Sequence, residues 1–163
     1  MRETLRISGA SPLRLKLEIT ESSVMARVDE MIATMTEMRT WGIGFSLDDF
    51  GTGYSSLSHL RLLPLDQLKI DRSFINNVSS DRKDASIVRT IIGLGRSLSM
   101  SVIGEGVETE AQRNFLLDEG CFLHQGFLYS PAVSGFALEA FLEASRRGAR
   151  RAGPELFLLE AQS

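Results

Sequence analysis

Acidic residues recur at the ends of short apolar segments along this sequence of 163 residues. The acids that close or follow a strand-like segment are Glu18, Asp48, Asp49, Asp71, Glu105 and Glu108. Parallel strands in β/α folds direct their carboxyl ends toward the ligand, so four of these side chains are expected to converge: Glu18, Asp48, Asp49 and Glu105. Carboxylates at such short distances from one another cannot all stay ionised unless a positive charge lies beside them.

Positive charge for such a cluster has two possible sources. Lys69 lies within the third strand-like segment, but one lysine is too little to neutralise four acids. A divalent cation, or a pair of them, is the simplest complement. Because all the candidate ligands are oxygen atoms, Mg²⁺ or Mn²⁺ fits better than zinc.

The adjacent acids Asp48 and Asp49 require a particular backbone path. Neighbouring residues within a regular strand point to opposite faces of the sheet. Both can reach one site only if the strand ends there and the chain turns, which Gly51 and Gly53 would allow. A carboxylate that bridges two metals ~3.5–4 Å apart is the usual arrangement for displacement at a phosphodiester.

Each of these residues also has a purely structural interpretation. A single acid at a strand end can cap a helix or face solvent. Lys69 could form an ion pair inside a barrel instead of contacting a metal-bound water or a phosphate oxygen. Gln125 could read the edge of a base or only satisfy backbone groups. His59 and His124 are interpreted as structural residues, and the methionines at positions 25–38 as core filler.

Strand-like and helix-like segments alternate along the chain. Strands are expected at residues 15–20, 45–49, 68–71, 101–105 and 123–129. Helices are expected at 25–38 with a stop at Gly42, at 57–63 before Pro64, at 85–98, at 109–120 with a capping box formed by Thr109 and Gln112, and from Ser134 to about 147. This alternation predicts parallel βαβ units. The expected fold is α/β, a parallel β/α (TIM-like) barrel with about five of eight strands, since a complete barrel takes ~250 residues.

Composition is that of one ordinary globular domain. Hydrophobic residues make up 43% of the chain, charged residues 24%, and the net charge is -3. This balance argues against disorder and does not point to a nucleic-acid polymer or a membrane as partner. The single Cys121 cannot form an internal disulfide and suits a reducing cytoplasm. Residues 1–147 are expected to form the domain, and residues 148–163 a basic and apolar tail.

Five segments, in order and with matching spacing, closely resemble the EAL family of cyclic di-GMP phosphodiesterases. The segments are LEITES (17–22), DDFGTGYSSL (48–57), LKIDRSFI (68–75), GEGVET (104–109) and QGFLYSPA (125–132). The resemblance extends from about residue 2 to residue 142. It implies a β/α barrel whose mouth binds two Mg²⁺ or Mn²⁺ ions and hydrolyses cyclic di-GMP to linear pGpG.

The resemblance also implies a role for individual residues. Glu18 would bind the first metal, Asp48 would bridge both metals and Asp49 would bind the second. Lys69 would contact the nucleophilic water, and Glu105 would act as general base or bind a metal through water.

Other matching residues are assigned supporting roles by the same resemblance. Glu108 would lie near Glu105, while Gln125 and Asp71 would support the site or the substrate. Residues 50–56, including Phe50, Gly51, Thr52 and Gly53, resemble a regulatory loop anchored by Glu21, which links the site to a dimer surface.

The sequence also departs from the family pattern. The Glu-Ala-Leu strand and a later asparagine ligand are absent, so about three strands and two ligands of the first metal are missing. Gly104 stands where alanine is commoner, and Phe127 where tyrosine is common. Three interpretations remain. In the first, the chain is the C-terminal part of a phosphodiesterase whose parent protein carries sensory or GGDEF domains, and it is weak or inactive alone. In the second it is a non-catalytic cyclic di-GMP-binding or interaction module, and in the third it is an inert fragment. The retained acids favour the first for the parent protein.

An open part-barrel is predicted to associate with copies of itself. Its sheet edges and apolar faces would otherwise remain uncovered. Light scattering at micromolar concentration should therefore give the mass of a dimer or larger species, and a stable monomer would contradict this expectation.

Overall fold

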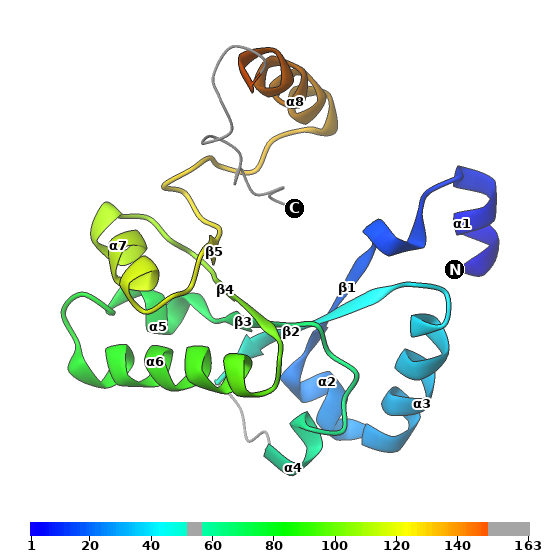
Figure 1. The fold of residues 1–163 in the computed structure, drawn as a ribbon, viewed down its shortest axis with the longest axis horizontal. Coiled ribbons are helices and arrows are strands. Elements are labelled where there is room, and N and C mark those ends of the chain that lie inside the picture. Colours follow the sequence, from blue (N-terminus) through cyan, green and yellow to red (C-terminus); the bar gives the residue numbers. More distant parts are fainter. Residues whose placement is uncertain (52–56, 150–163) are drawn as a thin grey trace.

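The computed structural model describes residues 1–51 and 57–149, which form one parallel sheet with helices packed around it (Figure 1). Its strands are β1 (Lys16–Thr20), β2 (Gly44–Phe50), β3 (Gln67–Ile70), β4 (Ser101–Gly104) and β5 (Leu123–His124). Its α-helices are α1 (Arg2–Ser8), α2 (Glu21–Ala26), α3 (Val28–Arg39), α4 (Leu57–Leu60), α5 (Arg72–Asn76), α6 (Arg82–Ser97), α7 (Glu110–Asp118) and α8 (Gly135–Ala149), and a 3₁₀ turn spans Pro12–Arg14.

The strands lie side by side in chain order, β1-β2-β3-β4-β5, and every pairing is parallel. This is the order of strands in a β/α barrel, so the α/β fold class expected from the sequence is confirmed. Because all strands run the same way, their carboxyl ends share one edge of the sheet. The described residues contain no helix that is long and apolar enough to cross a membrane.

Strand β2 does not end at the adjacent acids Asp48 and Asp49, where the sequence predicted its end. The strand was predicted to end at Asp49 and to turn through Gly51 and Gly53. It continues to Phe50 instead, and its register with β3 shifts between Leu47 and Phe50. Asp49 itself adopts a left-handed backbone with φ of 54°. The irregularity that re-aims the two acids therefore lies inside the strand, as a bulge does, and Gly53 lies outside the described residues.

The starts of α7 and α8 agree with the sequence, whereas α6 begins at Arg82 instead of the expected residue 85. The capping box of Thr109 and Gln112 is present at the start of α7, and Ser134 accepts a hydrogen bond from the Ala137 N–H at the start of α8. The helix expected at 25–38 is divided, because Arg27 leaves the helical region between α2 and α3.

Two further expectations need correction, and a third holds in part. The helix expected at 57–63 ends at Leu60, and the strand expected at 123–129 ends at His124. The strand is short because Gly126, with φ of 155°, turns the chain directly after Gln125. Of the methionines in α3, Met35 is fully buried and Met38 is partly buried against the core, as expected for core filler, whereas Met31 is not among the core residues.

The core lies between the sheet and the helices α2 to α7. Its largest fully buried side chains come from the strands, from α3 to α7 and from loops between them: Met35, Ile43, Leu47, Leu60, Leu68, Ile70, Ile75, Val88, Val107 and Leu116. Consecutive residues are buried in β2 (Phe45 to Leu47) and in β3 (Leu68 to Ile70), although both strands also contain polar residues.

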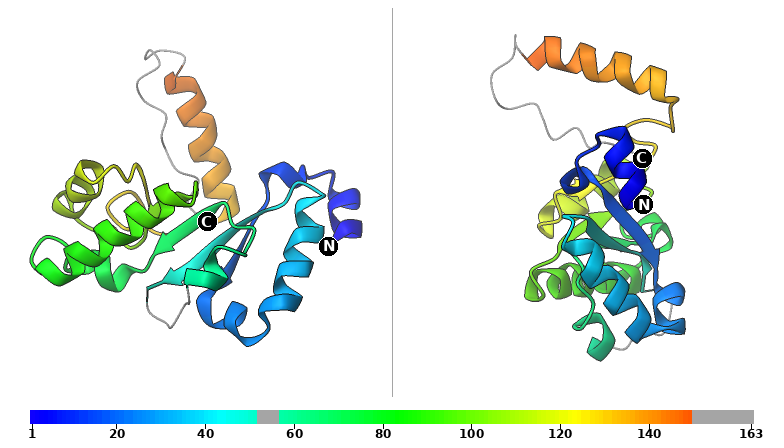
Figure 2. Two further views of the ribbon diagram at one scale, coloured as in Figure 1. Left: turned by 60° about the horizontal axis from the view of Figure 1, so that its bottom comes forward. Right: turned by 90° about the vertical axis from the view of Figure 1, so that its right-hand side faces the viewer.

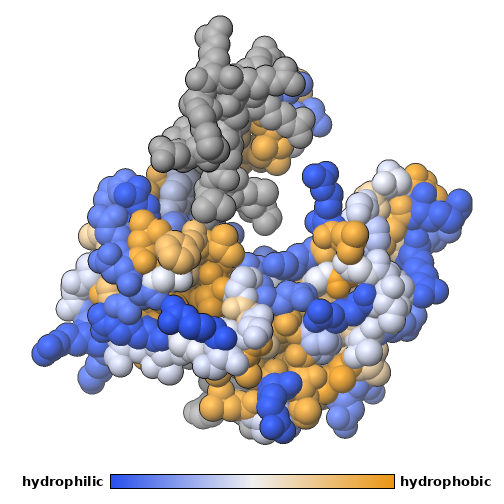
Figure 3. Space-filling model, viewed as in Figure 1, coloured by the Kyte–Doolittle hydropathy of each residue, from blue (hydrophilic) through white to orange (hydrophobic). Residues whose placement is uncertain are grey.

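Helix α8 stands away from this core (Figure 2). Its Phe136 is 84% exposed, and Phe141 and Leu142 are exposed as well. Apolar residues are also visible on the face shown in Figure 3. Among the described residues, β1 pairs only with β2 and β5 pairs only with β4, so both edges of the sheet are open.

Replacing a central core leucine should destabilise the fold strongly. Leu68→Ala removes a side chain that is fully buried on β3, which should lower the free energy of unfolding by about 2–5 kcal/mol. The matched control Leu62→Ala, at a residue that is 55% exposed, should change it by less than about 0.5 kcal/mol. Urea denaturation of both variants measures the difference, and equal midpoints would contradict the placement of the core.

Candidate functional site

Lys69 lies at the centre of an acidic cluster at the carboxyl edge of the sheet. Its Nζ is 2.7 Å from Oε2 of Glu18 on β1, 3.1 Å from Oδ1 of Asp48 on β2 and 2.7 Å from Oε1 of Glu105, which directly follows β4. The lysine side chain is only 6% exposed, whereas that of Glu18 is 47% exposed. Neighbouring parallel strands thus bring together four side chains that are far apart in the sequence.

Burial and the neighbouring charges shift the pKa values of Lys69 and Glu105 in this cluster. Burial by itself would lower the pKa of Lys69, but hydrogen bonds to Glu105 and Glu18 outweigh it and raise the pKa above its usual value. Burial raises the pKa of Glu105, and the nearby charges of Asp48 and Glu18 add to this, while Lys69 opposes it. Lys69 therefore stays charged at neutral pH, and Glu105 holds a proton more readily than an ordinary glutamate.

A second grouping overlaps the first. One oxygen atom from each of Asp48, Asp49 and Glu105 lies within 4.8 Å of the others. Burial, then the charges of Asp48 and Asp71, raise the pKa of Asp49. With four carboxylates facing a single ammonium group, the site carries an excess of negative charge. A set of oxygen donors with that excess fits a hard divalent cation.

Asp71 supports the site from the start of α5. Its carboxylate accepts hydrogen bonds from the N–H of Ser73 at 2.9 Å and from the Ser73 hydroxyl, and so caps the helix. Burial would raise the pKa of Asp71, but these bonds and the charge of Arg72 lower it on balance. Asp71 is therefore an ionised cap that lies beside Asp49, and its negative charge contributes to the raised pKa of that neighbour.

Gln125 and Glu108 have different positions relative to the cluster. The side-chain amide of Gln125 donates to Oε1 of Glu105 at 2.8 Å, so Gln125 belongs to the site. The side chain of Glu108 is exposed, and its backbone N–H donates to Oε1 of Gln112 at the start of α7. The structure thus places Glu108 in a helix cap, next to the site in sequence but outside the three-carboxylate grouping of the described residues.

Glu21 lies beneath the end of β2. It is buried, and its Oε2 accepts a hydrogen bond of 3.4 Å from the N–H of Gly51. Phe50 is buried, and Gly51 has φ of 100° with the ring of Phe74 close against it. This contact joins the first residues of the expected regulatory loop to α2, whereas Thr52 and Gly53 lie outside the described residues.

Two features of the site were not singled out from the sequence. Gly106 has φ of 67°, and a Cβ there would lie 2.6 Å from Cβ of Arg72. His124 and Tyr129 form a side-chain hydrogen bond next to Gln125. The glycines of the GEG and QG segments were a usable signal for the first feature, because glycine is favoured where the backbone needs positive φ. The second feature depends on a tertiary turn and has no sequence signal.

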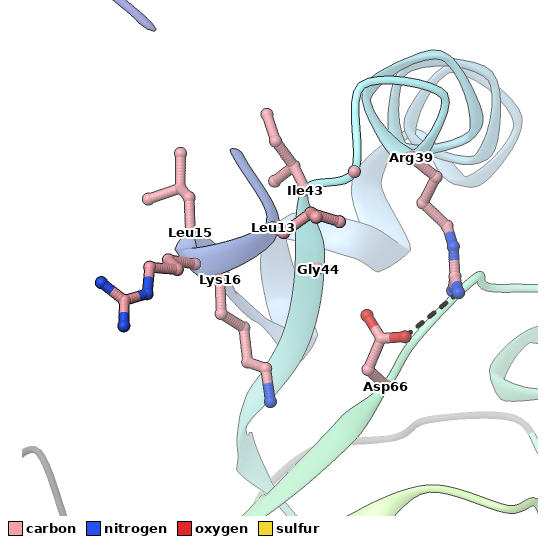
Figure 4. A pocket seen from close by; sticks show the side chains of 9 residues that line it. Leu13, Leu15, Lys16, Arg39, Ile43, Gly44 and Asp66 are labelled. Carbon is pink, nitrogen blue, oxygen red and sulfur yellow. Dashed lines mark ion pairs between the residues drawn. The ribbon is translucent and has the colours of Figure 1, made fainter. Parts of the chain in front are cut away.

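The cavity shown in Figure 4 lies elsewhere. It has a volume of about 430 Å³ and is lined by residues near the amino-terminal ends of β1, β2 and β3: Leu13, Arg14, Leu15, Lys16, Arg39, Gly42, Ile43, Gly44 and Asp66. Arg39 and Asp66 form an ion pair of 3.1 Å across it. Since none of the clustered carboxylates lines this cavity, cavity volume does not mark the candidate site.

A parallel β/α sheet with polar side chains clustered at its carboxyl edge is the arrangement of β/α-barrel proteins, which bind their ligands at that edge. Residues 1–132 match the family described as EAL domain, and the chain belongs to that family. This finding confirms the resemblance recognised in the sequence motifs.

Relatives of known description are similar over most of this chain. The cyclic di-GMP phosphodiesterase NbdA of Pseudomonas aeruginosa is 44% identical over 146 residues, which are 90% of this chain and 19% of NbdA. The bifunctional diguanylate cyclase/cyclic di-GMP phosphodiesterase MucR of the same organism is 48% identical over 128 residues, which are 78% of this chain and 19% of MucR. The chain thus spans about a fifth of the length of these relatives.

Solved structures show the same similarity in three dimensions. The PaMucR phosphodiesterase in complex with c-di-GMP superposes with a TM-score of 0.81 at 45% identity, covering 84% of this chain and 56% of that chain. The manganese/cyclic di-GMP complex of Klebsiella pneumoniae BlrP1 superposes with a TM-score of 0.74 at 31% identity, covering 79% of this chain and 33% of that chain.

Removing the central ammonium group should leave the carboxylates unbalanced. At pH 7.5, Lys69→Met is expected to lower the free energy of unfolding by roughly 2–4 kcal/mol, below the full cost of an unpaired buried charge because Glu18 is half exposed. The raised pKa of Lys69 stabilises the fold fully below the unfolded pKa of ~10.4, so pH 7.5 lies within the window.

Lys83→Met is the matched control for this substitution, because Lys83 is exposed. It should shift the free energy of unfolding by less than about 0.5 kcal/mol. Urea denaturation at pH 7.5 compares the two variants, and a loss in Lys69→Met no greater than in Lys83→Met would show that the ion pairs add nothing.

Proposed function

We propose that this chain is part of a metal-dependent cyclic di-GMP phosphodiesterase that hydrolyses one phosphodiester bond to give pGpG. The observation that carries the proposal is the cluster of Glu18, Asp48 and Glu105 around Lys69, with Asp49 beside it. The names of NbdA and MucR, and the nucleotide bound in the PaMucR structure, support the same substrate.

The clustered carboxylates are the residues that would hold the metal. Glu18 and Asp48 would contribute to a first site, with Asp48 shared and Asp49 serving a second. Mg²⁺ or Mn²⁺ fits the oxygen donors, and the manganese complex of BlrP1 is consistent with that choice. When bound, a divalent cation lowers the pKa of water and neutralises charge at the phosphate.

The protein side chains would divide the remaining work. The buried ammonium of Lys69 would donate to the attacking water or to a phosphate oxygen. Glu105, whose pKa is raised and whose Oε1 accepts a hydrogen bond from Gln125, would accept the proton of the water. In the balanced step, the water oxygen bonds to phosphorus, the bond from phosphorus to one ribose oxygen breaks, and that oxygen takes a proton.

We further propose that the chain taken by itself turns over slowly or not at all. Its residues do not include the Glu-Ala-Leu strand or the asparagine that the family resemblance assigns to the first metal, and loss of metal ligands should cost orders of magnitude in rate. The same deficit favours a second candidate function, which is binding of cyclic di-GMP without cleavage.

Several wider features complete the proposal. The parent protein would carry sensory or GGDEF domains, as the bifunctional description of MucR suggests. It would act in the cytoplasm, since a sequence with a single cysteine, Cys121, suits a reducing compartment. Copies of the chain would associate through the open sheet edges and the exposed apolar face of α8. The boundary near residue 147 stays a prediction, since residues 150–163 lie outside the described part.

Incubation with Mn²⁺ and cyclic di-GMP tests the function directly. We expect metal-dependent binding of the nucleotide together with slow formation of pGpG, both abolished by excess chelator. Asp48→Asn should reduce turnover by about a hundredfold or more, because the shared carboxylate loses its charge. Asp118→Asn, an exposed acid at the end of α7, is the matched control and should behave as the unaltered chain.

The outcomes separate the candidate functions. Turnover that disappears in Asp48→Asn supports a phosphodiesterase. Tight binding without pGpG supports the receptor. Absence of both binding and turnover contradicts both proposals for this chain.

A further inference from the structure

A side-chain pair joins the two ends of the turn that follows β5. His124 is buried, and its Nδ1 lies 2.6 Å from the hydroxyl oxygen of Tyr129. The two ring planes are parallel to within 5°, with 5.9 Å between their centroids. Burial, and then the charge of Arg113, lower the pKa of His124, so the ring is neutral near pH 7. A neutral imidazole keeps one nitrogen as an acceptor.

The backbone between these two residues is held tightly against the loop after β4. The N–H of Gln125 donates to the carbonyl of Gly104, the N–H of Val107 to the carbonyl of Gln125, and the N–H of Leu128 to the carbonyl of Val107, each at 2.9 Å. A Cβ on Gly126 would lie 2.2 Å from the backbone N and O of Val107. Such close contact leaves the turn little room to adjust.

Side chains contribute unequally to holding this turn in place. Phe127 is 71% exposed and adds little buried area, whereas Leu128 and Tyr129 are partly buried against the core. The closure of the turn therefore depends on its backbone bonds, on this packing and on the hydrogen-bonded pair at its ends.

Gln125 links the turn to the carboxylate cluster through a side-chain hydrogen bond. Its amide donates to Oε1 of Glu105 at 2.8 Å, and the same oxygen lies 2.7 Å from Nζ of Lys69. The orientation of the Glu105 carboxylate thus depends on where the turn places the Gln125 amide.

We propose that Tyr129 and His124 are positioning residues, whose hydrogen bond closes the turn at residues 125–128 and thereby holds the Gln125 amide on Glu105. The importance of this arrangement for turnover rests on the function proposed above. The coupling between the pair and Gln125 is independent of it, because that coupling is a property of the folded chain.

Nuclear magnetic resonance of the full chain, without metal or nucleotide, measures this coupling. The readout is solvent exchange of the Gln125 side-chain amide protons, whose signals are assigned by their loss in Gln125→Ala. Tyr129→Phe removes only the hydroxyl, and His124→Phe removes the ring nitrogen that bonds to it. Each should speed the exchange about fivefold, the population change expected from losing one net hydrogen bond.

Two further variants separate positioning from a general loss of structure. His124→Asn places an amide near the position of the ring Nδ1 and should restore exchange to within about twofold of the unaltered chain. Phe127→Tyr adds a hydroxyl at an exposed position of the same turn and should leave exchange unchanged.

Unchanged exchange in folded Tyr129→Phe overturns the proposal, and so does faster exchange in Phe127→Tyr of the same size. If His124→Phe fails to fold, Tyr129→Phe and His124→Asn decide the matter. Turnover gives a second readout, in which Tyr129→Phe should lower kcat with little change in KM. Since the amide measurement needs neither metal nor nucleotide, its failure is distinct from failure of the proposed function.

Discussion

One ammonium group held among carboxylates is the electrostatic constraint on which this site depends. Lys69 is nearly fully buried, and burying a charge is costly unless partners surround it. Glu18, Asp48 and Glu105 provide those partners, and in return the lysine reduces their mutual repulsion. The negative charge of the acids still exceeds the positive charge of the lysine, so the edge of the sheet remains suited to a divalent cation. An anionic phosphodiester would be repelled by this excess negative charge unless such a cation were bound.

Irregular backbone segments position the side chains of the acidic cluster. The bulge in β2 and the left-handed Asp49 bring two adjacent acids toward one site, which a regular strand would separate. On the other side, the tight contact between Gly126 and Val107 sets the position of Gln125, and through it that of Glu105. These irregular segments lie at the carboxyl ends of regular strands, where the sheet itself provides a rigid frame.

The open edges of the sheet and the exposed face of α8 bear on how this unit works. A sheet whose outer strands lack partners presents free backbone donors and acceptors, and exposed aromatic residues such as Phe136 favour association. The chain spans about a fifth of the length of NbdA and MucR. The contacts of Lys69 with Glu18, Asp48 and Glu105, by contrast, are made within the described residues.

Sequence alone determined the alternation of strands and helices, the family, and the set of acids at strand ends, because these follow from local periodicity and from motifs. It also predicted the capping box of α7, whose residues are close in sequence. Only the tertiary structure decided that β2 continues past Asp49, that β5 ends at His124, that Glu108 lies outside the three-carboxylate grouping, and that His124 meets Tyr129. The path of β2 depends on its register with β3, and the turn after β5 is fixed by backbone bonds to the loop after β4, so neither follows from a local pattern of residues.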